Sequence, residues 1–272
     1  KKENDHGYKY VLASLPFVRP LKSIMGMKRE HETLGRISTF SARGVKTMNL
    51  KEFQIWLNNH GAKSIHTGGQ IAEDGKKGAE TRAAVFQVFT NLQAPAVSKQ
   101  QLIGFAERLG GSFNQIKAVS IVESGGSGFN DQGQPKALYE RHYFWKRIQI
   151  RIPFLSDPAA GGYTIDADKD GLNDSWEKLA DAAMTGNVLK AFESASFGKF
   201  QVMGAWGEKL GYANALEFAY SMVGSEVAHY EALVRYIEVF GGKSKFQAIN
   251  GNPANCTAFA KFYNGPKQRG YD

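Results

Sequence analysis

The stretch K-A-V-S-I-V-E-S-G-G-S-G-F at residues 117–129 predicts a buried helix that ends at an open surface. The helix finishes on one carboxylate, Glu123, and the glycines that follow supply no side chains to cover it. The negative end of the helix dipole and the neighbouring apolar residues both disfavour ionisation, so we expect a raised pKa for Glu123. Such a carboxyl group can protonate a leaving oxygen near neutral pH. The alternative is an exposed glutamate at a helix end.

A second carboxylate, Glu140, lies in the run Y-E-R-H-Y-F-W at residues 139–145. Aromatic rings beside charged groups suit sugars, because the rings stack on apolar sugar faces while the charges bind hydroxyl groups. Most glycosidases use two carboxylates, and the distance between them distinguishes retention from inversion. Sequence spacing leaves that distance open, and the aromatic residues are equally compatible with a protein core.

Composition excludes several classes of protein. The 272 residues are 42% hydrophobic and 22% charged, as in folded globular proteins, and no apolar run is long enough to cross a bilayer. A single cysteine, Cys256, precludes an intrachain disulfide. Residues 1–47 hold ten Lys/Arg against four Asp/Glu and so carry +6 of the net charge of +8. This predicts a basic arm attracted to anionic surfaces, with a solvated extension as the alternative.

Hydrophobic periodicity predicts a mainly helical chain. Residues 48–60 and 79–89 predict two short helices around a glycine-rich loop, with Asn49 as an N-cap and a joint at Pro95. We divide the chain into a basic arm (1–47), a small helical domain (48–97) and a catalytic domain (98–272). In the catalytic domain we expect helices at 98–109, 113–123, 138–148, 175–184, 214–220 and 226–240, and short strands at 150–154 and 197–203.

Five motifs follow one another along the second half of the chain: E-S-G-G-S-G-F, L-Y-E-R-H, P-x-x-G-G-Y, S-F-G-x-F-Q-V-M-G and F-Y-N-G-P. This ordered set resembles the N-acetylmuramidase domain of modular phage endolysins, which belongs to the lysozyme-like superfamily. The resemblance implies a mainly α, lysozyme-like catalytic domain with a small β element. It also implies hydrolysis of the β-1,4 bond between N-acetylmuramic acid and N-acetylglucosamine in peptidoglycan, which causes bacterial lysis.

The same resemblance implies roles for individual residues. Glu123 matches the catalytic acid, and Glu140 matches the second carboxylate of the family. Gln201 would bond a sugar amide or hydroxyl in the glycan groove, and the pair Tyr263 and Asn264 would close the groove around the acid. For this pair a capped helix end with a buried tyrosine is the alternative. The complete set of expected substrate-binding residues is Ser124, Tyr139, His142, Phe200, Gln201, Tyr263 and Asn264.

Residues 48–97 resemble, less closely, a peptidoglycan-binding domain of the three-helix type. The matching stretches are F-Q-x-W-L-x-x-x-G and D-G-K-K-G-x-x-T-R-A-A-V. Residues 62–70 depart from that family, because they lack its usual apolar markers. The resemblance implies a small three-helix domain that retains the enzyme on the cell wall.

The run D-A-D-K-D-G-L-N-D-S-W-E at residues 166–177 has the spacing of a calcium-binding loop. Its carboxylates would repel one another unless a cation joined them. The alternative is a solvated acidic loop that caps the following helix. We expect no cofactor for catalysis and a structural calcium ion at this loop. Its candidate ligands are Asp166, Asp168, Asp170, the carbonyl of Leu172, Asp174 and Glu177.

The expected partner is bacterial peptidoglycan. Nucleic acid is not expected, since the aromatic motifs lie outside the basic arm. We expect a monomer without a transmembrane segment, made in the cytoplasm of a phage-infected bacterium and acting on the periplasmic cell wall, or else carried on the virion. Two other functions stay open: a lytic transglycosylase, which uses a single acid to form an anhydro sugar, and a non-catalytic glycan-binding virion protein.

Overall fold

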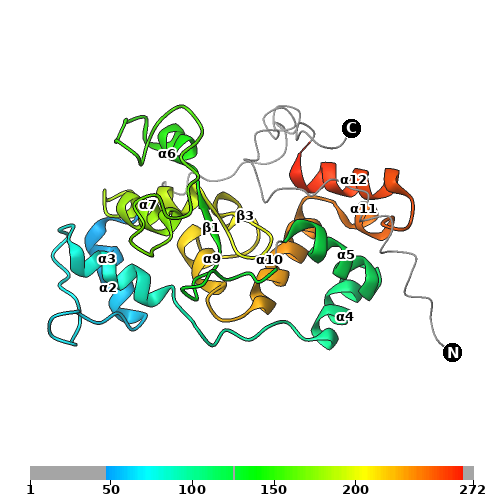
Figure 1. Cartoon of the computed structure of the whole chain (residues 1–272), viewed down its shortest axis with the longest axis horizontal. Helices are drawn as coiled ribbons and strands as arrows, with labels where there is room; N and C mark the ends of the chain where they lie inside the picture. Colours follow the sequence, from blue (N-terminus) through cyan, green and yellow to red (C-terminus); the bar gives the residue numbers. More distant parts are fainter. Residues whose placement is uncertain (1–46, 125, 266–272) are drawn as a thin grey trace, which may run out of the picture.

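The computed structural model describes residues 47–124 and 126–265 (Figure 1). Within these residues the chain forms eleven α-helices, one short 3-10 helix and one three-stranded sheet, which confirms the expected mainly helical fold with a small β element. None of the described helices is both long and apolar enough to span a membrane. Residues 1–46 of the predicted basic arm lie outside the described residues. The elements in chain order are α2 (Leu50–Asn59), α3 (Ala79–Val88), α4 (Lys99–Arg108), α5 (Phe113–Glu123), β1 (Ala137–Tyr139), α6 (Arg141–Ile148), α7 (Asp174–Ala183), α8 (Val188–Glu193), β2 (Ala195–Phe197), β3 (Val202–Met203), the 3-10 helix η1 (Gly204–Trp206), α9 (Ala215–Ser221), α10 (Glu226–Val239), α11 (Lys243–Gln247) and α12 (Pro253–Asn264).

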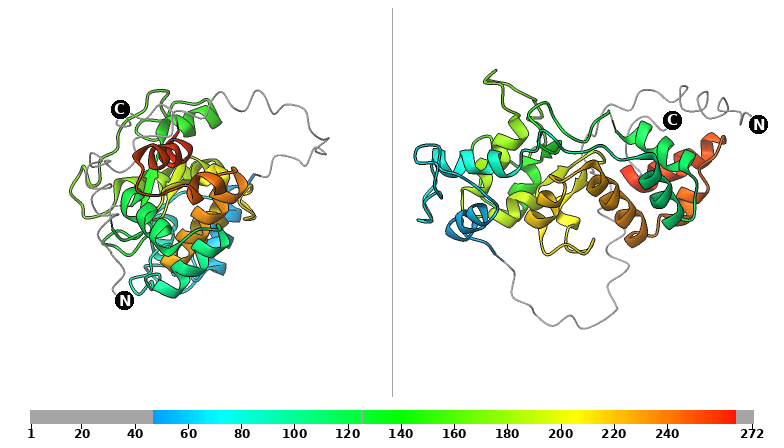
Figure 2. Two further views of the ribbon diagram at one scale, coloured as in Figure 1. Left: turned by 90° about the vertical axis from the view of Figure 1, so that its right-hand side faces the viewer. Right: turned by 90° about the horizontal axis from the view of Figure 1, so that it is seen from below.

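The described helices form an elongated molecule with the sheet near its centre. Helices α2 and α3 lie at one end, and α4, α5, α11 and α12 lie at the other (Figure 1). The views turned by 90° agree with this arrangement, with α10 running between the centre and the α5–α12 end (Figure 2). The sheet and α10 are therefore placed to connect the two ends.

Side chains fix the starts of several helices. Asn49 caps α2 and forms a capping box with Glu52, which confirms the expected N-cap. Ser112 does the same for α5, together with Gln115. Such reciprocal caps satisfy backbone N–H groups that the first helical turn leaves unpaired. Helix α5 covers residues Phe113–Glu123, as the periodicity predicts, so Glu123 is its last residue.

The sheet has the order β1-β2-β3, and both strand pairs are antiparallel. The prediction of a helix from residue 138 is wrong at its start, because Leu138 lies in β1 opposite Ser196 and the helix begins only at Arg141. The expected strand at 150–154 is also wrong, since this segment contributes one isolated bridge between Ile152 and Ser156. Residues 197–203 contain the end of β2, a turn and β3. Pairing with the distant strand β2 decided the start of the 138–148 segment, and local periodicity does not report such pairing.

The small N-terminal helices share a hydrophobic core with the rest of the chain. Phe89, fully buried, lies 4.9 Å from Trp176 of α7 and 5.5 Å from Phe192 of α8, measured between ring centroids. Trp56 of α2 donates from Nε1 to the Glu217 carboxylate of α9 at 2.8 Å. The structure places two helices in residues 47–97, and their buried side chains belong to the same cluster as those of the larger part. The boundary at residue 97 stays a prediction about function, and it does not separate two cores.

Candidate active site

Glu123 ends α5 as a half-buried carboxylate. The amide Nδ2 of Asn264, the last residue of α12, donates to its two oxygens at 3.1 and 3.0 Å. The hydroxyl of Tyr230 in α10 donates to Ser120 Oγ at 2.6 Å, one turn before Glu123. Residues more than 100 positions apart in the chain thus hold this helix end in place.

Burial raises the pKa of Glu123 from its ordinary value to about 7, and the hydrogen bond from Asn264 opposes part of that rise. Apolar surroundings disfavour the charged form of a carboxyl group, while a donor to its oxygens favours it. The direction agrees with the sequence prediction. A carboxyl group that titrates near neutral pH is suited to general-acid catalysis, because it is protonated before the reaction and can release the proton during it.

The end of α12 connects Glu123 with the turn between β2 and β3. The hydroxyl of Tyr263 donates to the backbone carbonyl of Phe200 at 2.6 Å. Tyr263 is buried, and its burial raises the pKa of the hydroxyl well above the ordinary value, so the hydroxyl stays protonated and remains a donor. Its neighbour Asn264 contacts Glu123, so one helix end positions both the acid and the turn.

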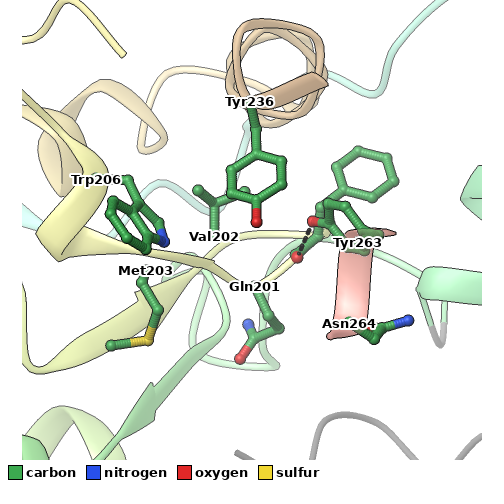
Figure 3. Close-up of a pocket in the computed structure, with 8 residues that line it drawn as sticks. Gln201, Val202, Met203, Trp206, Tyr236, Tyr263 and Asn264 are labelled. Carbon is green, nitrogen blue, oxygen red and sulfur yellow. Dashed lines mark hydrogen bonds between the residues drawn. The ribbon is translucent and has the colours of Figure 1, made fainter. Parts of the chain in front are cut away.

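A small pocket opens beside this helix end. Its lining combines aromatic rings with the amide side chains of Gln201 and Asn264. Figure 3 shows Tyr263 bonded to the backbone beside Gln201, and the amide of Asn264 pointing away from that of Gln201. The residues that line the pocket are Phe200, Gln201, Val202, Met203, Trp206, Tyr236, Tyr263 and Asn264.

Gln201 is also a structural part of the turn. It adopts a left-handed backbone conformation with φ of 50°, which is uncommon for a residue other than glycine. Its amide nitrogen donates to the carbonyls of Gly198 at 2.9 Å and Lys136 at 3.2 Å, and its amide oxygen accepts from Ser196 Oγ at 3.0 Å. Gln201 lines the pocket, and sugar binding by this residue stays a prediction.

Glu140 follows β1 and is almost completely buried, with 2% of its surface exposed. Its Oε2 accepts a hydrogen bond from the Tyr163 hydroxyl at 2.5 Å and lies 3.2 Å from His142 Nδ1. Nearby, Arg141 donates to the carbonyls of Ala159 and Ala160. The connection between α6 and α7 therefore covers this carboxylate. Among the described residues, no hydrogen bond or ion pair joins Glu140 to Glu123.

Three other expected substrate-binding residues are engaged within the protein. Tyr139 and His142 are each 2% exposed, and the Tyr139 hydroxyl donates to the carbonyl of Leu155 at 2.9 Å. The Ser124 hydroxyl turns back to the carbonyl of Ser120 in its own helix. The structure thus groups Phe200, Gln201, Tyr263 and Asn264 with Glu123, and places Tyr139 and His142 around Glu140 instead.

Sequence reasoning missed several residues of the site. Tyr163 belongs to the quoted P-x-x-G-G-Y motif, but its bond to Glu140 depends on how the α6–α7 connection folds back. Trp206 and Tyr236 line the pocket. The aromatic residue just after the Q-V-M-G motif could have indicated Trp206. Tyr236 lies on the long helix α10, where nothing in the local sequence distinguishes it from a core residue.

The acidic loop gathers its carboxylates into two overlapping groups, one of Asp166, Asp168 and Asp174 and one of Asp168, Asp170 and Glu177. In each group the oxygens lie within 4.8 Å of one another. This set of hard oxygen donors fits calcium.

The protein also supplies cations to the loop. Lys178 contacts Asp174 at 3.3 Å, and Arg82 of α3 pairs with Glu177. Part of the acidic charge is therefore balanced without a metal ion.

Comparison with known proteins identifies the family of the chain. Residues 112–272, more than half of the chain, match the family model of N-acetylmuramidase. A crystal structure of Burkholderia AP3 phage endolysin matches with a TM-score of 0.56 and 24% sequence identity, over 82% of this chain and 90% of that chain. This likeness shows a shared fold. No curated protein matches the chain. With Glu123, Glu140 and Asn264 all inside the matched residues, the chain belongs to the N-acetylmuramidase family.

Proposed function

We propose that this chain cleaves the β-1,4 bond between N-acetylmuramic acid and N-acetylglucosamine with Glu123 as the general acid. N-acetylmuramidases are glycoside hydrolases of peptidoglycan, and the chain is a member of that family. The observation that supports the role of Glu123 is its setting. It is a half-buried carboxyl group at a helix end, beside a pocket, and burial raises its pKa to about 7.

The chemistry follows from this setting. Protonated Glu123 donates its proton to the glycosidic oxygen while the bond from that oxygen to the sugar carbon lengthens. The carboxylate that remains keeps two contacts from Asn264 Nδ2, at 3.0 and 3.1 Å. Asn264 thus stabilises the charge that forms on Glu123 during proton transfer. Burial keeps the group protonated until that moment.

Glu140 is the proposed second carboxylate, acting as base or nucleophile. In the structure the hydroxyl of Tyr163 bonds to it, and the carboxylate is almost fully buried. Direct action on water or on the sugar requires this Tyr163 bond to open. The burial of Glu140 favours one alternative reaction, lytic transglycosylation, which needs a single acid and yields an anhydro sugar.

The deciding experiment is digestion of purified sacculi followed by mass spectrometry of the released muropeptides. Hydrolysis adds one water to each cleaved bond, whereas transglycosylation yields the anhydro product. Glu123→Gln should fold normally by circular dichroism and lose at least about 100-fold in rate, because an amide cannot deliver the proton. Glu107→Gln, an exposed position on α4, is the matched control and should keep full activity. Retention of more than about a tenth of wild-type activity by Glu123→Gln contradicts the proposed role.

We also propose a biological setting for this activity. The fold is like that of a phage endolysin, and peptidoglycan is the substrate of the family. The enzyme is made in the cytoplasm of a phage-infected bacterium and acts on the periplasmic wall. Expression of the wild-type chain and of Glu123→Gln in the periplasm of a test bacterium checks this setting. Lysis is expected with the first and not with the second.

A structural calcium ion at residues 166–177 is a separate proposal. It is supported by the all-oxygen donor set and by the closeness of the carboxylates of Asp166, Asp168 and Asp174. Asp166 already shapes the loop by accepting the N–H groups of Asp170 at 3.1 Å and Gly171 at 3.2 Å. Calcium would stabilise this turn and would take no part in proton transfer.

A further inference from the structure

The segment after Glu123 consists of small residues that pack little apolar surface. Ser124 leaves the helix in an extended conformation, with φ of −133° and ψ of 128°. Gly126 and Ser127 are exposed, and Gly128 is buried. Small side chains cannot anchor a segment by burial, so its position depends on hydrogen bonds to neighbouring elements. Those bonds in turn affect where the end of α5 lies.

Besides the backbone bond from the Lys136 N–H to the Gly128 carbonyl at 2.8 Å, two charged residues supply such bonds. The backbone N–H of Gly128 donates to Glu226 Oε1 at 2.9 Å, and the ammonium group of Lys199 donates to the carbonyl of Gly126. Lys199 Nζ also lies 3.4 Å from the same oxygen of Glu226. We call this pair the Glu226–Lys199 clamp. Glu226 accepts a backbone N–H of the segment after Glu123, and Lys199 donates to one of its carbonyls.

The clamp is buried and tightly fitted. The side chains of Lys199 and Glu226 are 9% and 11% exposed. A Cβ atom on Gly128 would lie 2.1 Å from His229 Nδ1, so only glycine fits against α10 at this position. His229 Nδ1 accepts the backbone N–H of Lys199 at 3.0 Å, so α10 also holds the turn between β2 and β3. A buried ion pair with such close neighbours has little freedom to rearrange.

The clamp also completes a closed path of contacts around the acid. Lys199 precedes Phe200, whose carbonyl accepts the Tyr263 hydroxyl. Asn264 follows Tyr263 and bonds Glu123. Lys199 in turn bonds the Gly126 carbonyl in the segment after Glu123, which closes the path. Opening one contact of such a path frees the position of the others.

We propose that Glu226 and Lys199 are positioning residues that keep the carboxyl group of Glu123 buried against Asn264. This inference rests on the proposed role of Glu123 as the acid. Neither residue needs to touch the glycan, because both act through the segment that follows α5.

The proposal has a consequence for pH dependence. If the clamp opens, Glu123 gains contact with water, and its pKa falls from about 7 towards the ordinary value for a glutamate. Since the acid must be protonated, the alkaline limb of the rate profile then moves to lower pH. The rate relative to wild type falls most above neutral pH and least near pH 5. A general loss of stability does not change the ratio in this way.

Other charged groups near the clamp are few. Lys136 and His229 interact electrostatically with Glu226, as does the Tyr230 hydroxyl. Burial lowers the pKa of His229 to about 4, well below the pH of the alkaline limb. On the other side, Glu123 faces Tyr263, whose hydroxyl stays protonated. The change of the alkaline limb is therefore assigned to Glu123.

The test compares Glu226→Gln and Lys199→Met with Glu231→Gln in the full chain. Glu231 is on the same helix and pairs with Arg108 and Arg235, away from the clamp, so it is a matched control. We expect each clamp variant to lose about 10- to 100-fold in kcat/KM on sacculi at pH 7.5, the size of effect expected for a misplaced catalytic group. The alkaline limb should move down by about one pH unit or more. The double variant should be no worse than the poorer single variant, because the two residues act as a unit.

A direct measurement accompanies the rates. Proteins labelled with ¹³C at the glutamate carboxyl carbons are titrated by NMR, and the Glu123 signal is assigned by its absence in Glu123→Gln. A lower midpoint in both clamp variants supports the proposal. An unchanged midpoint together with an unchanged alkaline limb overturns it, even if the overall rate falls. If Glu226→Gln does not fold, Lys199→Met decides the question alone. Activity in Glu123→Gln would instead refute the proposed function, so the two failures are distinguishable.

Discussion

Replacing Phe89 with alanine should destabilise the catalytic part of the molecule, although Phe89 lies in the segment predicted to bind the cell wall. Phe89 follows α3 and is fully buried. Its ring lies 4.9 Å from Trp176 and 5.5 Å from Phe192, and 6.0 Å from both Trp56 and Tyr220, measured between centroids. The ring therefore sits between the N-terminal helices and the helices α7 to α9.

The expected magnitude follows from these contacts. Truncation of a fully buried phenylalanine to alanine costs about 3–5 kcal/mol in the free energy of unfolding, because apolar contacts are lost and a cavity remains. In a protein of this size each kcal/mol lowers Tm by about 2–4 °C, which gives a decrease of about 6–20 °C. Ile65→Ala, in the same segment but 53% exposed, is the control and should change stability by less than about 0.5 kcal/mol.

Differential scanning calorimetry, combined with residual activity on sacculi after heating, measures the effect. One shared transition that moves to lower temperature, with activity lost at the same temperature, is the expected result. Two transitions in Phe89→Ala, with activity surviving to the wild-type temperature, would refute the reasoning. That outcome would mean that residues 48–97 unfold separately from the enzyme.

Three further outcomes are expected. Asn264→Ala removes the hydrogen bond that lowers the pKa of Glu123, so this pKa rises and the alkaline limb of the kcat/KM profile moves to higher pH. An unchanged alkaline limb would contradict the assignment of that limb to Glu123. Glu140→Gln should lose at least about 100-fold in hydrolysis if it is base or nucleophile, and near-normal turnover with anhydro products would assign the single-acid reaction. Calcium should stabilise the folded state by mass action, by about 2.7 kcal/mol at a hundredfold excess over Kd, and so raise Tm. The combined change of Asp166→Ala and Asp170→Ala should abolish this rise in Tm. If calorimetry detects no calcium binding at millimolar ion, the loop is a simple acidic turn.

Much of the catalytic helix could be predicted from the sequence, because local features determine it. Ser112 caps α5 and the apolar run ends at Glu123, so both ends of the helix can be read from neighbouring residues. The direction of the pKa shift of Glu123 was also predicted, and burial in the folded protein causes it. The ordered motifs then identified the family, which the match over residues 112–272 confirms.

The surroundings of Glu140 could not be predicted in this way. Leu138 and Tyr139 fit a helical pattern, but pairing with β2 makes them a strand. The burial of Glu140 depends on Tyr163, which the α6–α7 connection brings back to it. Helix α12 corresponds to the alternative given for Tyr263 and Asn264, a helix end with a buried tyrosine. Around Glu140, contacts between residues far apart in the chain outweighed the local preference.

The aromatic contacts of the N-terminal helices also determine where this chain can be recombined with others. A chimeric lysin made by exchanging residues 48–97 for a foreign wall-binding cassette would remove Phe53 and Phe89 from their places against Phe192. The incoming cassette would have to supply rings of matching shape, because otherwise the enzyme would lose part of its hydrophobic core. A junction placed before α2 leaves all of these contacts within one parent. The transferable unit for engineering is therefore the chain from residue 47 onward, and not the part that begins at residue 98.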